Sequence, residues 1–452
     1  FWFGRYFGWC RIAWLGMGIV GWNANAATFA ASRVSIDRSL EVGRGVARTY
    51  SFPQDHWNWP VDLTHQQGVR AGEMIFTGGQ VDLTPEGAVR NPGDLKAQCA
   101  GAMTYMRVLL EDLGSSTSDL VRLVVYFVGG ATEEKAVLAQ IAEFIGPNVM
   151  PVVNTISLDE LCYPDMMIEI EGVAMRGTSG EAIERQRLRD PRLPMLADGY
   201  SHVVRCSDMI FVSDMSALGA DGRVQNADDI AAQSKIMMEN LSAALSLVGA
   251  DMDDLVKLNT FYLGGGTAED WAVAAKVRIA YLNEPGPAAT GIPVTRFAQD
   301  GLCTKIAATA MLNADGSRIE KTYSWPDGHW DWPTHLPFKH GNKCGAMIHV
   351  GGQVSMDAGA NVLDTEDMVS QTRTAMANIK RVLAEFGADL DDVVKVTTFY
   401  QGNASARALH ENLLIRSASY AAPGPATTGI PMEALAYQAM VIEIEVIAML
   451  DR

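Results

Sequence analysis

The chain has 452 residues, of which 48% are hydrophobic and 20% are charged, and its formal net charge is −17. It is too long for one ordinary domain, and its composition is typical of proteins that fold around hydrophobic cores rather than of disordered ones. The negative charge argues against nucleic acids and anionic membranes as partners, because both attract basic faces. Its six cysteines are widely spaced, so neither a disulfide scaffold nor a metal site is expected.

The first 45 residues form a separate segment. Arg5 and Arg11 precede an apolar stretch from Ile12 to Trp22, and Ala24-Asn25-Ala26 is similar to a signal-peptide cleavage site. The alternative is a non-native extension, such as translated upstream sequence, because nothing in 1–45 matches the rest of the chain. We therefore expect 1–45 to be a disordered leader or extension. The protein would be cytoplasmic, or exported if residues 1–26 are a genuine signal peptide.

The remaining sequence contains one unit three times. AGEMIFTGGQVDL (71–83), CSDMIFVSDMSAL (206–218) and CGAMIHVGGQVSM (344–356) are spaced by 135 and 138 residues, and two further blocks repeat in the same order. Polar stretches separate the units and predict linkers. The prediction is three homologous domains at 46–176, 192–313 and 319–450, with linkers at 177–191 and 314–318.

The third unit shows the expected elements in chain order. Met347–Val350 predicts a strand, followed by a glycine turn and a second short strand. Asp367–Phe386 has the apolar spacing of a helix, with Gly387 just after it. Val393–Tyr400 predicts a strand, Ser405–Tyr420 a second helix, and Met440–Met449 a final strand. The order β-β-α-β-α-β predicts an α+β fold, in which two helices cover one face of a sheet.

These motifs resemble the RidA-type (YjgF-like) reactive-intermediate deaminase family. The resemblance rests on GYSHVVRCSDMIFVS in the second unit, on GGQV in the first and third, and on the terminal IEIE strands. It implies the chorismate-mutase-like fold and a homotrimer with sites in the clefts between neighbours. Three tandem units would then form an intrachain pseudo-trimer around a central sheet barrel, as a monomer or as a dimer of pseudo-trimers. The family hydrolyses imines and enamines without metal or organic cofactor.

The resemblance also implies individual residues. The family's catalytic Glu, which activates water, corresponds to Glu169 and Glu443, whereas the second unit has Lys305 there. Its strand-turn Gln corresponds to Gln80 and Gln353. The Arg that clamps the substrate carboxylate has no counterpart: Thr427 or Thr428 lies near that position, and Arg296 is displaced. This departure argues against a 2-imino acid substrate.

Two further motifs occur only in the first and third units. HWNWP (56–60) and HWDWP (329–333) place two tryptophans on the same side of an extended segment. Trp57 and Trp59, like Trp330 and Trp332, could form an apolar wall for a flat substrate, or pack the arm across a neighbouring domain. His56 and His329 could carry protons or make structural hydrogen bonds.

Glycine and histidine positions near these motifs are further candidates. Gly79 and Gly352 could offer N–H groups to an oxyanion, or permit a turn or bulge. His340 occupies a cleft-facing family position, which Gln67 and His202 fill in the other units.

Three functions are compatible with the sequence. The favoured one is a cofactor-free enzyme that deaminates a small imine or enamine in interdomain clefts. The first alternative is a small-molecule binding or regulatory protein without turnover. The second is a ring-opening amidohydrolase similar to cyanuric acid hydrolase. That family needs a Ser and a Lys in each unit, and here Arg122, Lys257 and Lys395 recur without a recurring Ser.

Overall fold

The computed structural model describes residues 46–451, so the predicted leader lies outside the described residues. Repeat 1 contains β1 (Arg48–Ser51), β2 (Gly68–Ala71), β3 (Met74–Thr77), α1 (Leu95–Asp112), β4 (Leu120–Val128), α2 (Ala131–Ile145), β5 (Val152–Leu158) and β6 (Ile168–Met175). Repeat 2 contains β7 (Arg185–Leu188), β8 (Val203–Cys206), β9 (Met209–Ser216), α3 (Ile230–Ser246), β10 (Leu255–Leu263), α4 (Ala268–Ile279), β11 (Ala288–Val294) and β12 (Thr304–Met311). Repeat 3 contains β13 (Lys321–Ser324), β14 (Gly341–Cys344), β15 (Met347–Gln353), α5 (Met368–Ala384), β16 (Val393–Gln401), α6 (Arg407–Ala418), β17 (Ala426–Met432) and β18 (Ile442–Met449). A short 3-10 helix precedes the fourth strand of each repeat. No helix within 46–451 has both the length and the apolarity of a membrane span.

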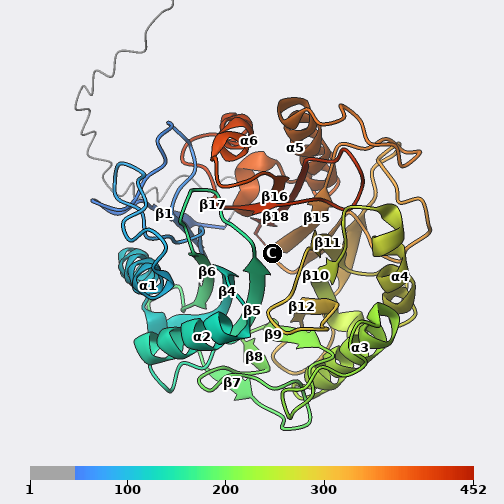
Figure 1. The fold of residues 1–452 in the computed structure, drawn as a ribbon, viewed down its shortest axis with the longest axis horizontal. Coiled ribbons are helices and arrows are strands. Elements are labelled where there is room, and N and C mark those ends of the chain that lie inside the picture. Colours follow the sequence, from blue (N-terminus) through green and yellow to red (C-terminus); the bar gives the residue numbers. More distant parts are fainter. Residues whose placement is uncertain (1–45, 452) are drawn as a thin grey trace, which may run out of the picture. The chain divides into compact units, whose positions relative to one another are not determined.

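Each repeat forms its own six-stranded mixed sheet with the same strand order, β1-β2-β3-β6-β4-β5 in repeat 1. The fourth and fifth strands are parallel and are joined by the second helix, whereas the other neighbours are antiparallel. The two helices of a repeat lie beside each other along its sheet, as α1 and α2 do in Figure 1. The α+β prediction is confirmed. The described strands that surround the centre of the predicted barrel belong to three six-stranded sheets, one from each repeat.

The helices begin and end where the sequence predicts. The carboxylate of Asp367 accepts hydrogen bonds from the backbone N–H groups of Val369 and Ser370, which caps the start of α5. Gly387 follows its end with a positive φ of 71°, a conformation that glycine adopts without strain. These signals placed α5 to within two residues.

Three strands of each repeat were missing from the prediction. The second strand (β2, β8, β14) is only four residues long. The first strand (β1, β7, β13) is short, and the fifth (β5, β11, β17) contains glycine and proline in repeats 2 and 3. The predicted turn at Gly351-Gly352 is wrong, because β15 continues through both glycines to Gln353. The ladder between β15 and β18 shifts register between Val350 and Gln353, which is the signature of a β-bulge.

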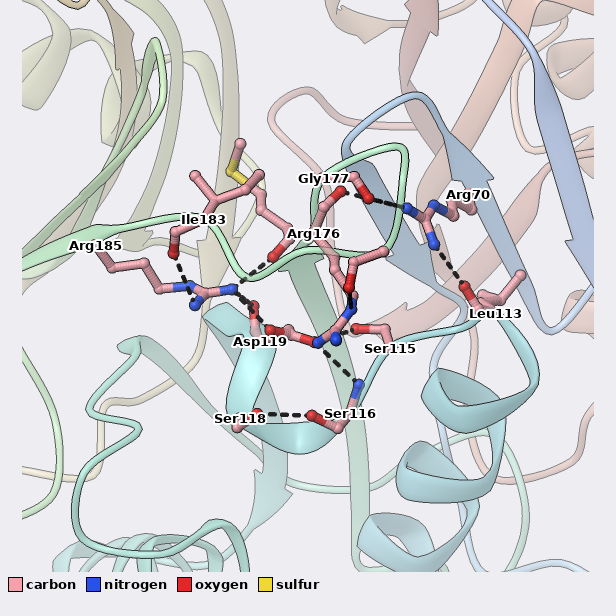
Figure 2. Close-up of polar contacts among 12 residues, drawn as sticks. Arg70, Leu113, Ser115, Ser116, Ser118, Asp119, Arg176, Gly177, Ile183 and Arg185 are labelled. Atoms are coloured by element: carbon pink, nitrogen blue, oxygen red, sulfur yellow. Dashed lines mark hydrogen bonds and ion pairs between the residues drawn. The ribbon is translucent and has the colours of Figure 1, made fainter.

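The stretch 177–191, predicted as a linker, contains β7, the edge strand of the second sheet. Figure 2 shows how repeat 1 holds it: Asp119 forms ion pairs with Arg176 (2.8 Å) and with Arg185 of β7 (3.0 Å). Arg70 donates to the carbonyl oxygen of Gly177 at 2.7 Å. The strand is therefore fixed to both repeats.

The three repeats contact one another in a cycle. Each fifth strand lies beside the next repeat and follows a proline whose carbonyl oxygen accepts a backbone N–H from that repeat. The donors are Ser201 to Pro151 (3.0 Å), Lys339 to Pro287 (3.3 Å) and Gln66 to Pro425 (3.2 Å). Repeat 1 thus contacts repeat 2, repeat 2 contacts repeat 3, and repeat 3 contacts repeat 1. This arrangement is the predicted intrachain pseudo-trimer.

Candidate active site

Two glutamates occupy the same place in repeats 1 and 3. Glu169 is the second residue of β6 and Glu443 the second residue of β18, and both side chains are buried. Because side chains alternate along a strand, Glu171 and Glu445, two residues further on, point to the same face as the first glutamates and lie next to them along the strand. The first glutamate of each pair lies at a junction between repeats, where the backbone N–H of Gly429 or of Gly291 from the neighbouring repeat donates to it.

The paired glycines make room for these carboxyl groups. A Cβ atom on Gly352 would lie 1.8 Å from Oε1 of Glu443, and one on Gly79 would lie 1.8 Å from Oε1 of Glu169. The preceding glycine allows the backbone of the neighbouring repeat to pack closely, because a Cβ on Gly351 would lie 2.5 Å from the carbonyl oxygen of Ala289. The N–H of Gly79 donates to the Thr427 carbonyl at 3.1 Å, so it is not available to an oxyanion.

We expect Gly352→Ala to displace Glu443 and to lower the free energy of unfolding by about 1–3 kcal/mol, because the added methyl group overlaps the carboxyl. Thermal unfolding would measure the loss. Gly265→Ala is the matched control, because a Cβ at Gly265 meets nothing within 4 Å. Equal stability of the two variants would contradict the assigned role of Gly352.

Both carboxyl groups are held in their neutral form at neutral pH. Burial raises the pKa of Glu169 to about 8, and the charge of Glu171 adds to the rise, whereas Lys395 and the Gly429 N–H oppose it. Burial likewise raises the pKa of Glu443 to about 8, against the opposing charge of Lys257. A carboxyl group with such a pKa can donate a proton at pH 7 and take one back, which suits general acid–base chemistry.

These two groups should make stability depend on pH. The native state keeps protons that the unfolded chain releases near its ordinary pKa of 4.5, so stability falls as pH rises from there through about 8. Between pH 5 and pH 9 we expect the Tm of the wild type to fall by about 5 °C more than that of the double variant Glu169→Gln/Glu443→Gln. Parallel Tm curves for the two proteins would contradict the raised pKa values.

Each glutamate faces a small cleft built from two repeats. The 2–3 cleft, of about 40 Å³, is lined by Glu443, Trp330 and Trp332 of repeat 3 and by Trp271 and Arg278 of repeat 2. The 1–3 cleft, of about 20 Å³, is lined by Glu169, Trp57, Trp59, Leu409 and Thr427, among others. Within each tryptophan pair the rings meet edge to face, with centroids 4.7 Å and 4.9 Å apart. The predicted tryptophans, glutamates, Gly79, Gly352 and Thr427 are therefore brought together.

The predicted histidines and glutamines lie behind the tryptophans rather than in the clefts. Nε2 of His329 lies 2.8 Å from Oε1 of Gln353, and His56 pairs with Gln80 at the same distance. Burial lowers the pKa of both histidines to about 4, so they are neutral at pH 7. His340 contacts the carbonyl oxygen of Trp330 at 2.9 Å and stacks on Trp332. These contacts favour the structural alternative, in which the four residues and His340 position the tryptophan arms.

Two buried arginines that were not predicted from the sequence lie at the clefts: Arg278 lines the 2–3 cleft, and Arg416 contacts Thr427, which lines the 1–3 cleft. Arg278 on α4 and Arg416 on α6 are related by the 138-residue offset of the repeats and are 3% and 0% exposed. Burial lowers the pKa of each to about 10, so both remain cations at neutral pH. Nε and Nη1 of Arg278 have no hydrogen-bond partner among the described residues.

Arg416 has a similar place behind the 1–3 cleft, although it is not among the residues that line that cleft. It donates to Asn412 at 3.0 Å and to Thr427 at 2.9 Å, but its Nη2 has no described partner. Neither arginine has a carboxylate partner in 46–451. A buried cation without a counter-charge is costly, so each cleft is suited to an anionic ligand.

The junction of repeats 1 and 2 lacks the glutamate that the other junctions have on one repeat and the arginine that they have on the other. Lys305 replaces the glutamate, and its Nζ lies 3.4 Å from Glu134 and 3.8 Å from Asp214. Counting from the start of the helix, Ile141 of α2 replaces the arginine. This junction therefore lacks both the glutamate and the arginine of the other two junctions, and its lysine is paired with Glu134 and Asp214.

The family model described as Endoribonuclease L-PSP matches the chain three times, at residues 62–176, 192–312 and 332–450. The chain belongs to this family. A RutC family protein of Pyrococcus abyssi is 31% identical over 112 residues, which are 25% of this chain and 85% of that protein. The 2-iminobutanoate/2-iminopropanoate deaminase of Escherichia coli K12 is 31% identical over 113 residues, 24% of this chain and 85% of the relative. The predicted RidA-type membership, with three tandem copies, is confirmed.

Solved structures resemble the chain at lower identity. A chorismatase crystal structure is 13% identical, covers 73% of this chain and 93% of its own, and has a TM-score of 0.49. The Mycobacterium tuberculosis protein Rv2704, of the YjgF/YER057c/UK114 family, is 23% identical, covers 24% and 85%, and has a TM-score of 0.21.

Within this RidA-type chain, Arg278 and Arg416 change an expectation drawn from the family. The absence of an arginine near Thr427 argued against a carboxylate-bearing substrate. In the structure, a helix of the neighbouring repeat brings a buried arginine to each of these two junctions. The detectable signal was the recurrence of an arginine at the 138-residue offset, in the last turn of the second helix of repeats 2 and 3.

Proposed function

We propose that the chain hydrolyses the C=N bond of a small imine, or of its enamine tautomer, that carries a carboxylate. The reaction takes place in the 1–3 and 2–3 clefts and converts imine and water into a carbonyl compound and ammonia. The observation that carries the proposal is that a buried neutral carboxyl group lines each cleft and that the neighbouring repeat supplies a buried arginine without a carboxylate partner: Arg278 lines the 2–3 cleft, and Arg416 contacts Thr427 of the 1–3 cleft. Relatives named as 2-iminobutanoate/2-iminopropanoate deaminases support the same reaction class.

Glu443 and Glu169 act first as acids in this proposal. The neutral carboxyl group donates its proton to the imine nitrogen, which makes the carbon a better electrophile. Water then adds to that carbon and gives a proton to the carboxylate just formed, producing a carbinolamine. The carboxyl group returns this proton to the nitrogen, ammonia leaves, and the carboxylate takes the hydroxyl proton of the carbinolamine as the carbonyl forms. The carboxyl group ends the cycle in its starting state.

Arg278 and Arg416 bind the substrate carboxylate and so fix the imine carbon relative to the acid. Burial raises the pKa of Tyr262, Glu443 raises it further, and Arg278 lowers it. The acid and the arginine therefore both lie near the ring of Tyr262. The tryptophan pairs cover the apolar part of the substrate and exclude bulk water, which strengthens the ion pair with the arginine.

The proposal is tested by ammonia release from an imine generated in the assay by an amino-acid oxidase. Alanine or 2-aminobutanoate would supply a carboxylate-bearing imine, and the corresponding amino-acid ester would supply a matched imine without the charge. We expect catalysis with the carboxylate and at least about 10²-fold lower kcat/KM with the ester. Stabilisation by 2-oxo acids without acceleration of either imine would instead favour the binding-protein alternative and reject the enzyme.

The two clefts should prefer different side chains. The position that is Trp271 in the 2–3 cleft is Leu409 in the 1–3 cleft, and Phe338 also lines only the former, whereas Tyr437 has its counterpart in Tyr163 of the latter. We expect aromatic imines to depend on Glu443 and small aliphatic imines to depend more on Glu169. Measuring kcat/KM for phenylalanine- and alanine-derived imines with each single Glu→Gln variant would test this. Equal losses for both substrates would contradict it.

A further inference from the structure

A third cavity lies where the three repeats meet, apart from both clefts. It has a volume of about 60 Å³, and none of the residues that line it also lines the 1–3 or 2–3 cleft. Each repeat contributes one cation to its wall at an equivalent position, spaced by 135 and 138 residues: Arg122, Lys257 and Lys395. The recurring cations of the sequence therefore face this central cavity and not the proposed active clefts.

Two of the three cations are neutralised by the next repeat in the cycle. Lys257 of repeat 2 lies 2.8 Å from Glu445 of repeat 3, and Lys395 of repeat 3 lies 2.7 Å from Glu171 of repeat 1. Each glutamate also accepts a hydrogen bond from a neighbouring polar side chain, Asn259 in the first pair and Thr428 in the second. Both carboxylates are thus held by a cation and a neutral donor.

The third pair is incomplete. By analogy, a carboxylate of repeat 2 should pair with Arg122 of repeat 1. The pairing glutamates Glu171 and Glu445 stand two residues after Glu169 and Glu443. In repeat 2 the same step from Lys305 leads to Ala307, which has no carboxylate. Arg122 has no carboxylate within ion-pair distance in 46–451, and its guanidinium makes one hydrogen bond, from Nε to Asn154 Oδ1 at 2.8 Å. The glutamate side chain that the other two pairs contain is missing beside it.

The wall therefore carries three cations and two carboxylates. His349, which also lines the cavity, adds no charge at neutral pH, because burial, with Lys257 and Arg122 nearby, lowers its pKa to about 3. Arg122 is only partly buried, and its one partner, Asn154, also donates to Asp214 of repeat 2, but no carboxylate contacts the guanidinium itself, so it can attract an anion into the cavity. A carboxylate matches the planar guanidinium with two parallel hydrogen bonds.

We propose that the central cavity binds one small carboxylate anion on Arg122, in the place where glutamate side chains pair with Lys257 and Lys395. The volume limits the ligand to an ion of the size of formate or acetate, because it holds only a few water-sized groups. The site does not depend on the proposed deaminase activity, because it shares no residue with the clefts.

Thermal unfolding of the full chain in sodium formate and sodium acetate would test the site. Ionic strength is kept constant with the sodium salt of a bulky sulfonate buffer, which is too large for the cavity. We expect a saturable rise in Tm of about 2–4 °C with either carboxylate. The variant Arg122→Gln should lose this response.

A second variant tests the site without added anion. Ala307→Glu supplies the missing carboxylate from the chain itself, so we expect a higher Tm in the absence of formate and no further response to it. Ala307→Gln is the matched control, with the same size but no charge, and should not raise Tm. The proposal is overturned if the wild type shows no saturable response, if chloride stabilises as well as formate, or if Ala307→Gln stabilises as much as Ala307→Glu.

Discussion

Replacing both Glu169 and Glu443 by glutamine is expected to lower the rate of imine hydrolysis by about 10³-fold while the protein stays folded. Glutamine keeps the size and one carbonyl oxygen of the carboxyl group but cannot donate a proton and take it back. Because both carboxyl groups are largely neutral at pH 7, the substitution removes little charge from the native state. Folding should therefore survive, and the loss should appear in kcat.

Single variants and an exposed control make this prediction specific. Each single Glu→Gln variant should keep the activity of the other cleft, so that only the double variant approaches the uncatalysed rate. Glu433→Gln alters an exposed carboxyl group of repeat 3 and should leave the rate unchanged. The assignment of the glutamates is wrong if the double variant retains more than about a tenth of the wild-type kcat/KM, since acid–base catalysis contributes at least about 10²-fold.

The sequence predicted those parts of the molecule that depend on local pattern. Three repeated blocks in one register identified the domains, and helix caps such as Asp367 and Gly387 located α5 closely. The glutamates and tryptophans of the clefts were found because they lie in contiguous motifs that recur in repeats 1 and 3. The fifth strands were missed because glycine and proline in β11 and β17 weaken the strand pattern, while pairing with the fourth strand holds them in the sheet.

The remaining errors concern residues whose role depends on a neighbouring repeat. Arg278 lies in the last turn of α4 and belongs to no recognisable motif. Only the junction of repeats 2 and 3, where it lines the same cleft as Glu443, gives it a role. Conversely, His56 and His329 stand beside tryptophans in the sequence, but each turns toward the glutamine of its own repeat. The order in which repeats meet was not predictable from the sequence, so the place of Arg278 could not be derived from it, and the histidine contacts depend on the folding of the arm onto its own sheet.

Replacing Arg278 and Arg416 together by methionine is expected to separate activity from stability. A buried guanidinium with unpaired N–H groups destabilises the native state, and methionine fills a similar volume without a charge. We expect the free energy of unfolding to rise by about 1–3 kcal/mol. For a carboxylate-bearing imine, kcat/KM should fall by about 10²–10³-fold, as expected when a charge-assisted bidentate contact is lost.

The ester imine distinguishes a binding role from a merely structural one. It cannot form the ion pair, so its kcat/KM should change less than about threefold in the arginine variant, whereas a distorted cleft would impair both substrates equally. Lysine provides a second comparison, because Arg278→Lys keeps the charge but not the planar pair of donors, and should recover only part of the activity. A variant that is less stable than the wild type, or that loses both substrates together, would show that these arginines support the fold. Higher stability with selective loss of the carboxylate substrate would show that the chain keeps two unpaired buried charges in order to bind it.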